Sequence, residues 1–274
     1  MKKQLRVGLV VEGNVTASPV LRLSCLQDEL GPIKSSGLQV ARRVSNFLRA
    51  GYGVTDYQDL ESAPLILLRL PDAEVPRIVG ELCETGLPFT EMSFLLCESW
   101  LTTDVLIPLK RRGAQIASLL NVGALSHNCF VVEGDRAAAR GTKRLLERGG
   151  ARAIELRPGT KPLYFAANLL STAIPIPVLQ MAQQALRASG VEGNDLTVVM
   201  SEWSGLLEQG VQKGGRGTWG GPLAECSAGV ANEHFKQLAV QDPDLAATLH
   251  QWLDLAQRQV SKRAKSQTAC AGRG

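Results

Sequence analysis

The first twenty residues constrain the fold most, because they contain a short apolar run that leads into a glycine turn. Residues 5–11 (LRVGLVV) have the composition of a buried parallel strand, and Gly13 and a potentially helical segment follow. A strand, a tight turn and a helix at the start of a chain form the setting of the dinucleotide-binding fingerprint G-x-G-x-x-G. The sequence therefore predicts a strand–turn–helix unit of the nucleotide-binding type.

Only one of the three fingerprint glycines is present. The glycine positions fall on Val11, Gly13 and Thr16. Gly13 keeps the place where a diphosphate approaches the main chain, whereas Val11 is poor at positive φ and Thr16 adds bulk between helix and strand. Two interpretations stay open: a remodelled cofactor site, or a turn that only connects two elements.

Strand and helix patterns alternate through the first half of the chain. The apolar runs predicted as strands are 5–11, 31–34, 54–57, 64–70, 93–97, 115–119, 130–133 and 152–156. The segments with helical spacing between them are 16–29, 37–48, 71–83, 101–112 and 135–148. Repeated β-α-β units with short connections predict an α/β fold with a mostly parallel sheet.

The pattern changes near residue 158, beyond which no convincing strand occurs. Helices are predicted over 161–188 with a kink at Pro175–Pro177, and over 195–212, 228–240 and 243–263, with a glycine-rich connection at 214–221. We expect three parts: a Rossmann-like domain over 1–158, an all-helical domain over 159–262, and a disordered tail over 263–274.

Composition excludes several classes of function. The 274 residues are 45% hydrophobic with a net charge of +4, and no aromatic residues are interleaved with the basic ones at the C-terminus, so nucleic-acid binding is not expected. No apolar run suggests a signal peptide or a membrane span, which predicts a cytoplasmic protein without a membrane partner. The six cysteines form no C-x-x-C pair, so neither a metal site nor a disulfide is expected.

Candidate binding residues follow the predicted strands, because ligands of open α/β sheets bind beyond the carboxyl ends of the strands. The candidate cofactor contacts are Gly13, Asn14, Val15, Lys34, Ser35, Arg69 and Pro71. A basic, hydroxyl-bearing end of the second strand suits a 2′-phosphate, so NADP is favoured over NAD. The alternative is that Lys34 is simply exposed.

The order of these segments resembles that of bacterial Rossmann-like proteins with a C-terminal helical domain of unknown function. These are distant relatives of pyrroline-5-carboxylate reductase, ketopantoate reductase and 6-phosphogluconate dehydrogenase. The resemblance covers most of residues 5–260, through segments such as RVGLVVEGNV, LILLRLPDAEVPRIV, FVVEGDRAAARGTKRLLERGGARAIEL, KPLYFAANLL and WGGP. It implies an NAD(P)-type domain, a helical domain that builds a homodimer, and an active site between domains.

The resemblance also implies catalytic residues. Lys161 and Tyr164 match the K-x-x-Y at the start of the first C-terminal helix, and Asn168 lies two turns beyond Lys161. These side chains would donate a proton and orient a small substrate, together with Ser99. The chain departs from the family where Cys97 and Trp100 replace the His and Gly of H-x-S-G, where Phe165 replaces a His, and where Asn121 lies at the usual His-Pro.

Two hypotheses follow. The first is an NADP-dependent reductase of a small carbonyl or imine, with Arg69 and Ser99 orienting the substrate. The second is a non-catalytic, dimeric binding or regulatory protein, which the missing glycines and histidines favour. The surviving architecture favours the oxidoreductase.

Overall fold

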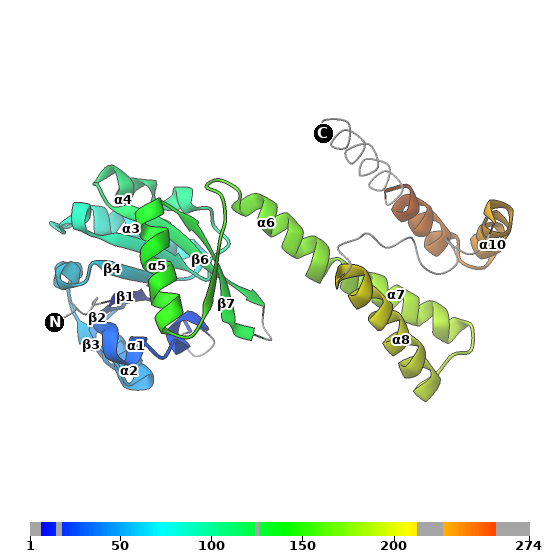
Figure 1. Cartoon of the computed structure of the whole chain (residues 1–274), viewed down its shortest axis with the longest axis horizontal. Coiled ribbons are helices and arrows are strands. Elements are labelled where there is room, and N and C mark those ends of the chain that lie inside the picture. Colours follow the sequence, from blue (N-terminus) through cyan, green and yellow to red (C-terminus); the bar gives the residue numbers. More distant parts are fainter. Residues whose placement is uncertain (1–6, 15–17, 124–125, 213–226, 256–274) are drawn as a thin grey trace, which may run out of the picture. The chain divides into compact units, whose positions relative to one another are not determined.

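The computed structural model describes residues 7–14, 18–123, 126–212 and 227–255 (Figure 1). The chain divides into two compact units, Met1–Val178 and Leu179–Gly274. The last strand ends at Glu155, close to the boundary expected near residue 158, but the first unit continues into the helix that follows. Val15, Thr16, the loop at 214–221 and the tail at 263–274 lie outside the described residues.

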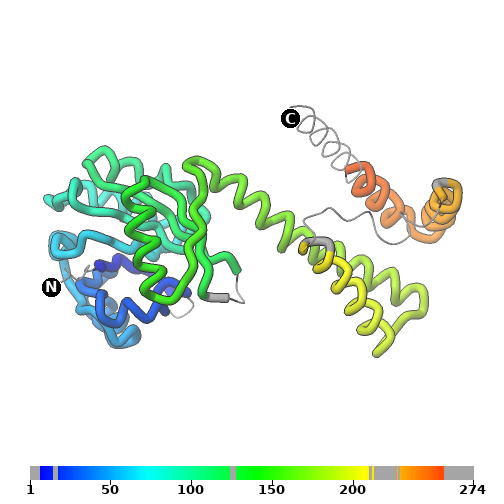
Figure 2. The backbone as a smooth tube through the Cα atoms, viewed as in Figure 1, coloured from blue at the N-terminus to red at the C-terminus, as the bar shows by residue number. Residues whose placement is uncertain are grey.

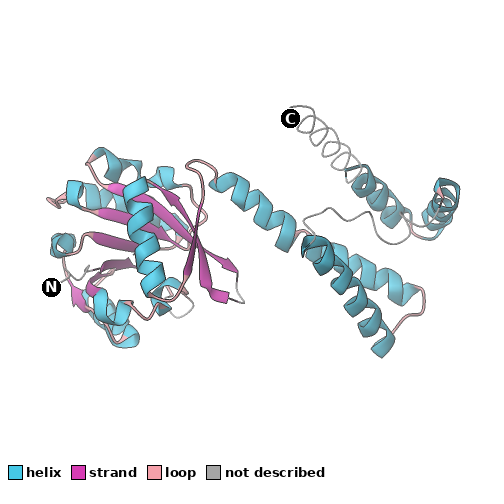
Figure 3. Ribbon diagram, in the orientation of Figure 1, coloured by secondary structure: helices cyan, strands magenta, loops and turns pink. Residues whose placement is uncertain are grey.

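The first unit is built on one eight-stranded sheet in the order β3-β2-β1-β4-β5-β6-β7-β8 (Figure 3). The strands are β1 (Val7–Val11), β2 (Leu30–Lys34), β3 (Tyr52–Val54), β4 (Leu65–Arg69), β5 (Ser93–Cys97), β6 (Gln115–Gly123), β7 (Ser126–Gly134) and β8 (Arg152–Glu155). All neighbouring pairs are parallel except β6 and β7, between which the chain reverses direction (Figure 2). The predicted α/β fold with a mostly parallel sheet is confirmed.

Helices cover both faces of this sheet. The face of Leu9 and Leu67 packs against α1 (Leu26–Glu29), α2 (Leu38–Leu48) and α5 (Arg136–Arg148). The face of Ile66 and Leu68 packs against α3 (Val75–Cys83) and α4 (Ile107–Arg111). Alternate residues of each central strand enter different cores, so these strands are apolar throughout, as the continuous run 64–70 predicted.

Three predicted elements differ from the observed ones. The single helix over 16–29 is wrong: a 3-10 helix, η1 (Val20–Arg22), and the short α1 are separated by an extended Leu23. The break lets Val20, Leu21, Leu23 and Leu26 all be buried, whereas a regular helix would point them in different directions. The strand over 54–57 lies instead at β3, because Asp56 caps the 3-10 helix η2 (Tyr57–Ser62). The helix over 101–112 divides into η5 (Thr103–Leu106) and α4.

Beyond Glu155 the described residues form helices only. They are α6 (Lys161–Asn168), the π-helical η6 (Leu169–Ala173), α7 (Pro175–Ala188), α8 (Gly193–Gln212), α10 (Ala228–Gln241) and residues 243–255. The irregularity predicted near Pro175 occurs as η6, directly before a proline that donates no backbone hydrogen bond.

The helical run Lys161–Ala188 is long and apolar enough to cross a membrane by length and composition, with a mean hydropathy of 1.4 over an 18-residue window. The expectation that no stretch reaches such a composition is therefore wrong for this segment. The segment was overlooked because polar residues interrupt the apolar run, although its mean hydropathy is high. The core helix of a soluble protein can reach the same length and composition but is mostly buried, whereas none of the apolar window of this helix is buried.

Candidate functional site

Three loops from neighbouring strands meet at one edge of the sheet. Val11 pairs with Arg69, and Leu68 with Leu96, so β1, β4 and β5 end at similar levels. The turns that follow these strands carry Gly13, Pro71 and Ser99. The strand-end rule therefore brings most of the predicted binding residues to a common edge.

The turn after β1 depends on its glycine. Gly13 has a φ of +77°, a conformation that L side chains rarely adopt. A Cβ at this position would lie 3.3 Å from Cγ of Pro71, and the backbone N of Glu12 donates a hydrogen bond to Arg69 O at 3.1 Å. Pro71 thus forms one wall of the glycine turn, while Val15 lies outside the described residues.

The end of β2 is already engaged with its neighbours. Ser35 is buried, and its Oγ donates a hydrogen bond to Val11 O at 2.8 Å. The Nζ of Lys34 donates to Ser35 O at 2.6 Å and lies 4.7 Å from the centre of the Tyr57 ring. Both residues predicted to hold a 2′-phosphate therefore have internal partners, although Lys34 still places a positive charge at this end.

A charge network that the sequence did not reveal lies beside the glycine turn. Arg77 contacts the carboxylate of Glu12 at 3.2 Å and that of Glu81 at 2.5 Å. Tyr57 donates its hydroxyl to Glu81 at 2.9 Å, and burial together with this carboxylate raises the pKa of Tyr57. Because Glu12 precedes Gly13, its pairing with Arg77 reduces the negative charge that an incoming diphosphate would meet.

Arg69 and Glu98 form an ion pair across the ends of β4 and β5. The Nε of Arg69 lies 2.7 Å from Oε2 of Glu98, at an angle that makes the contact ionic rather than a well-aligned hydrogen bond. The other oxygen of Glu98 accepts hydrogen bonds from Ser18 Oγ and Val20 N, both at 2.9 Å. Glu98 has a φ of +57°, and these contacts hold it there.

Lys161 is buried at the start of α6 and fixes the loop after β5. Its Nζ donates hydrogen bonds to the carbonyls of Ser99 at 2.8 Å and Leu101 at 2.5 Å. Its backbone N donates to Glu133, whose other oxygen accepts from Thr103. Burial lowers the pKa of Lys161 to about 8.

Tyr164 and Asn168, the other two residues implied on this helix, contact different partners from Lys161. Tyr164 is half-buried and stacks on Trp100, with ring centres 6.2 Å apart, and burial raises the pKa of Tyr164. Trp100 also meets Phe165 edge-on at 5.3 Å. The Oδ1 of Asn168 accepts a hydrogen bond from Thr172 of the same helical run at 3.2 Å, so its side chain is engaged away from Lys161.

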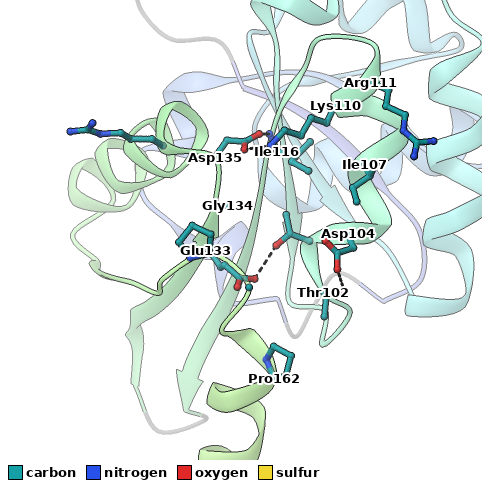
Figure 4. Close-up of a pocket in the computed structure, with 14 residues that line it drawn as sticks. Thr102, Asp104, Ile107, Lys110, Arg111, Ile116, Glu133, Gly134, Asp135 and Pro162 are labelled. Carbon is teal, nitrogen blue, oxygen red and sulfur yellow. Dashed lines mark hydrogen bonds and ion pairs between the residues drawn. The ribbon is translucent and has the colours of Figure 1, made fainter.

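A cavity of about 690 Å³ lies on the β6–β7 side of the sheet, and Figure 4 shows its lining. Its walls come from η5, α4, the end of β7 and the start of α6, and include Glu133 and Pro162. The ion pair between Lys110 and Asp135 lies within it. None of the sequence-predicted site residues lines this cavity, so the candidate site is the strand-end edge, where the predicted residues gather.

Within the described part of the chain, neither a reactive thiol nor a metal site contributes to this edge. Cys25, Cys83, Cys97 and Cys129 are free, and burial raises the pKa of Cys97 well above its usual value. Among the described residues, no group of three or more histidine, cysteine or acidic side chains is placed to hold a metal ion.

Comparison with known proteins connects the fold to oxidoreductases. The model of a domain of unknown function, DUF2520, matches residues 128–254. No curated protein sequence matches the chain significantly. Among solved structures, a protein from Bacteroides fragilis described as an NADP oxidoreductase has a TM-score of 0.70 at 14% identity, over 95% of this chain and 98% of its own.

Two further structures extend the comparison. An imine reductase variant from Myxococcus stipitatus, in complex with NAD⁺, has a TM-score of 0.65 at 12% identity, over 93% of this chain and 94% of its own. A pyrroline-5-carboxylate reductase from Coxiella burnetii has a TM-score of 0.59 at 10% identity, over 92% and 99%. At such identities the likeness establishes the fold, which is one that oxidoreductases use.

Proposed function

We propose that this chain, which carries a DUF2520 domain and is a Rossmann-like protein with a C-terminal helical domain, has a catalytic function. The proposed function is that of a nicotinamide-dependent reductase of a small carbonyl or imine compound. The observation that carries the proposal is the Gly13 turn at the sheet edge where β1, β4 and β5 end. Ligands of this fold bind at such an edge.

The residues at the edge fit a nicotinamide dinucleotide. Gly13 has a positive φ and no Cβ, which lets Pro71 close one side of the turn, and the main chain of Gly13 and Asn14 is the proposed contact of the diphosphate. Lys34 at the end of β2 supports NADP rather than NAD, because its charge suits a 2′-phosphate. When bound, a reduced nicotinamide supplies a hydride to the carbon of a C=O or C=N group and leaves oxidised.

Tyr164 is the better placed of the two implied proton donors. Its hydroxyl is protonated at neutral pH, since burial raises its pKa, and its ring is held by Trp100. Lys161 is buried, and two of its three N–H groups are used by carbonyls. In the proposed step Tyr164 gives its proton to the substrate oxygen or nitrogen as the hydride reaches carbon, and water reprotonates the tyrosinate. Ser99 and Lys161 then act as positioning residues.

The same edge supports a second candidate, a non-catalytic binding or regulatory protein. Ser35 donates to Val11, and Arg69 is paired with Glu98, so two predicted ligand contacts have internal partners instead. Such pairing is expected where a site no longer has to bind a charged cofactor.

We also propose a homodimer through the C-terminal helices. Along the run Lys161–Ala188, Leu163 is 71% exposed, Leu170 64% and Ile176 56%. Large apolar side chains exposed along one helical run favour an interaction site. A second copy is the favoured partner over a membrane, because Gln180 and Arg187 interrupt the apolar surface.

Titration with NADPH tests the reductase proposal. Thermal unfolding of the full chain is followed with NADPH, NADH and no ligand. Micromolar binding predicts a clear rise in Tm, because a hundredfold excess over Kd stabilises a protein by about 2.7 kcal/mol. No shift at millimolar NADPH or NADH would reject the reductase and leave the non-catalytic candidate.

A further inference from the structure

We propose that Trp100 determines the substrate specificity of this site, and that the site selects compounds with a flat, uncharged, unsaturated ring beside the C=O or C=N group. The inference rests on the proposed function and deepens it. It depends on an aromatic wall that is held in place next to the proposed proton donor.

The loop that presents Trp100 is fixed on both sides of the residue. The preceding and following carbonyls, of Ser99 and Leu101, both accept hydrogen bonds from the buried Nζ of Lys161. Leu101 N also donates to Ser99 Oγ at 3.1 Å. The backbone of Trp100 is therefore held before any ligand arrives, which is the arrangement that a specificity residue requires.

The indole ring forms a wall with two residues of α6. Its plane is 21° from that of Tyr164 and 71° from that of Phe165. Trp100 remains 42% exposed and Phe165 43% exposed, so these rings keep accessible surface beside the tyrosine. Aromatic surfaces favour offset-stacked or edge-on contact with other rings, and a substrate positioned at Tyr164 would present its ring to this wall.

The charges at the same edge disfavour an anionic substrate. Arg69, the cation expected to meet a substrate carboxylate, is paired with Glu98. Lys161 is buried, with its Nζ committed to two carbonyls. A carboxylate placed here would have to displace Glu98 from Arg69, whereas an uncharged ring displaces only water.

Three ketones of similar size test the inference: acetophenone, cyclohexyl methyl ketone and 4-acetylbenzoate. Their Kd values are measured by calorimetry on the full chain, with and without NADP⁺, which permits no ketone reduction. We expect acetophenone to bind about three- to tenfold more tightly than cyclohexyl methyl ketone, which is the range of a single aromatic contact. It should also bind more tightly than 4-acetylbenzoate, whose carboxylate has to displace Glu98 from Arg69. Equal binding, or tighter binding of 4-acetylbenzoate, overturns the inference.

Variants assign any preference to the indole. Trp100→Ala should abolish the preference for acetophenone over cyclohexyl methyl ketone, and Trp100→Phe should retain most of this preference. Trp203→Ala is the matched control, because Trp203 of α8 is 44% exposed and belongs to the second unit, and this variant should bind like the wild type. A preference that survives Trp100→Ala, or a change in molar mass caused by this variant, overturns the inference, the latter by assigning Trp100 to a subunit interface.

The two proposals fail separately. If the chain binds acetophenone through Trp100 but neither NADPH nor NADH, the aromatic site stands and the reductase is rejected. If it binds NADPH without any Trp100-dependent preference among the ketones, the reductase stands and the specificity inference is rejected.

Discussion

Glu98 and Arg69 join the ends of two adjacent strands, with Oε2 of the first 2.7 Å from Nε of the second. The remaining oxygen of Glu98 anchors Ser18 and Val20, which follow the glycine turn. One carboxylate thus links β4, β5 and the segment after β1. Glu98 and Arg69 are therefore part of the framework of the candidate site rather than free ligand groups.

Gly13→Ala should lower NADPH affinity by about tenfold or more, because a Cβ at this position would lie 3.3 Å from Cγ of Pro71 and would strain the turn that the proposed diphosphate contacts. Gly150→Ala is the matched control: Gly150 has a φ of +75°, similar to the +77° of Gly13, and no atom within 4 Å of an added Cβ. Both variants carry backbone strain, so thermal shifts with and without NADPH separate binding from stability. Equal loss of affinity in both would place the cofactor elsewhere.

Lys161 should make stability depend on pH in the alkaline range. Burial lowers its pKa from 10.5 to about 8, so between these values the unfolded chain binds more protons than the folded one. The free energy of unfolding of the wild type should therefore rise relative to that of Lys161→Met from about pH 8 to pH 10.5, and the difference should be constant below pH 7. Urea titrations across this range measure it. A difference that falls with pH would contradict the assigned burial effect.

Glu29→Gln should destabilise the first unit without affecting ligands. Both carboxylate oxygens of Glu29 contact Arg148 at 2.6 Å, which ties the end of α1 to the end of α5. Because Glu29 is nearly buried but Arg148 is partly exposed, we expect a loss of about 1–2 kcal/mol. Chemical denaturation measures the loss, and Lys143→Gln, which breaks a fully surface pair with Glu147, should cost less.

Leu170→Glu should convert the proposed dimer into a monomer. The side chain is 64% exposed on the apolar helix, and a charge there opposes burial against a second copy. Gln180→Glu adds the same charge to the same helical run without removing apolar surface and should stay dimeric. Light scattering after size-exclusion chromatography gives the molar mass. A wild type that is monomeric at micromolar concentration would reject the dimer.

The sequence predicted the architecture well because apolar periodicity reports burial. The run 64–70 is apolar at every position, since alternate residues of β4 enter different cores, and this pattern allows little but a central strand. The region after Gly13 was harder. No residue of 20–29 forbids a helix, and only the tertiary packing that buries Leu21, Leu23 and Leu26 together shows that the helix is broken.

The sequence predicted where the candidate site lies, but not which of its side chains interact with one another. The strand-end rule placed Arg69 and Ser99 at one edge, yet the sequence gives no sign that Glu98 would engage Arg69 or that Lys161 would reach the carbonyls around Trp100. Such contacts join residues about 30 to 80 positions apart, and local patterns carry no information about them. The change from Gly to Trp100 was a usable signal, because so large a residue needs a surface such as Tyr164 to pack on.

The antiparallel β6–β7 hairpin has a consequence for how the chain reaches its native state. Its two strands follow each other in the sequence, whereas β1 pairs with β4 (Leu65–Arg69), which lies much farther along the chain. Contacts that are close in sequence form at a lower entropic cost, so β6 and β7 should order early and give the later crossovers a template. Pulsed hydrogen exchange during refolding should then find amides of this hairpin protected before those of Val7–Val11.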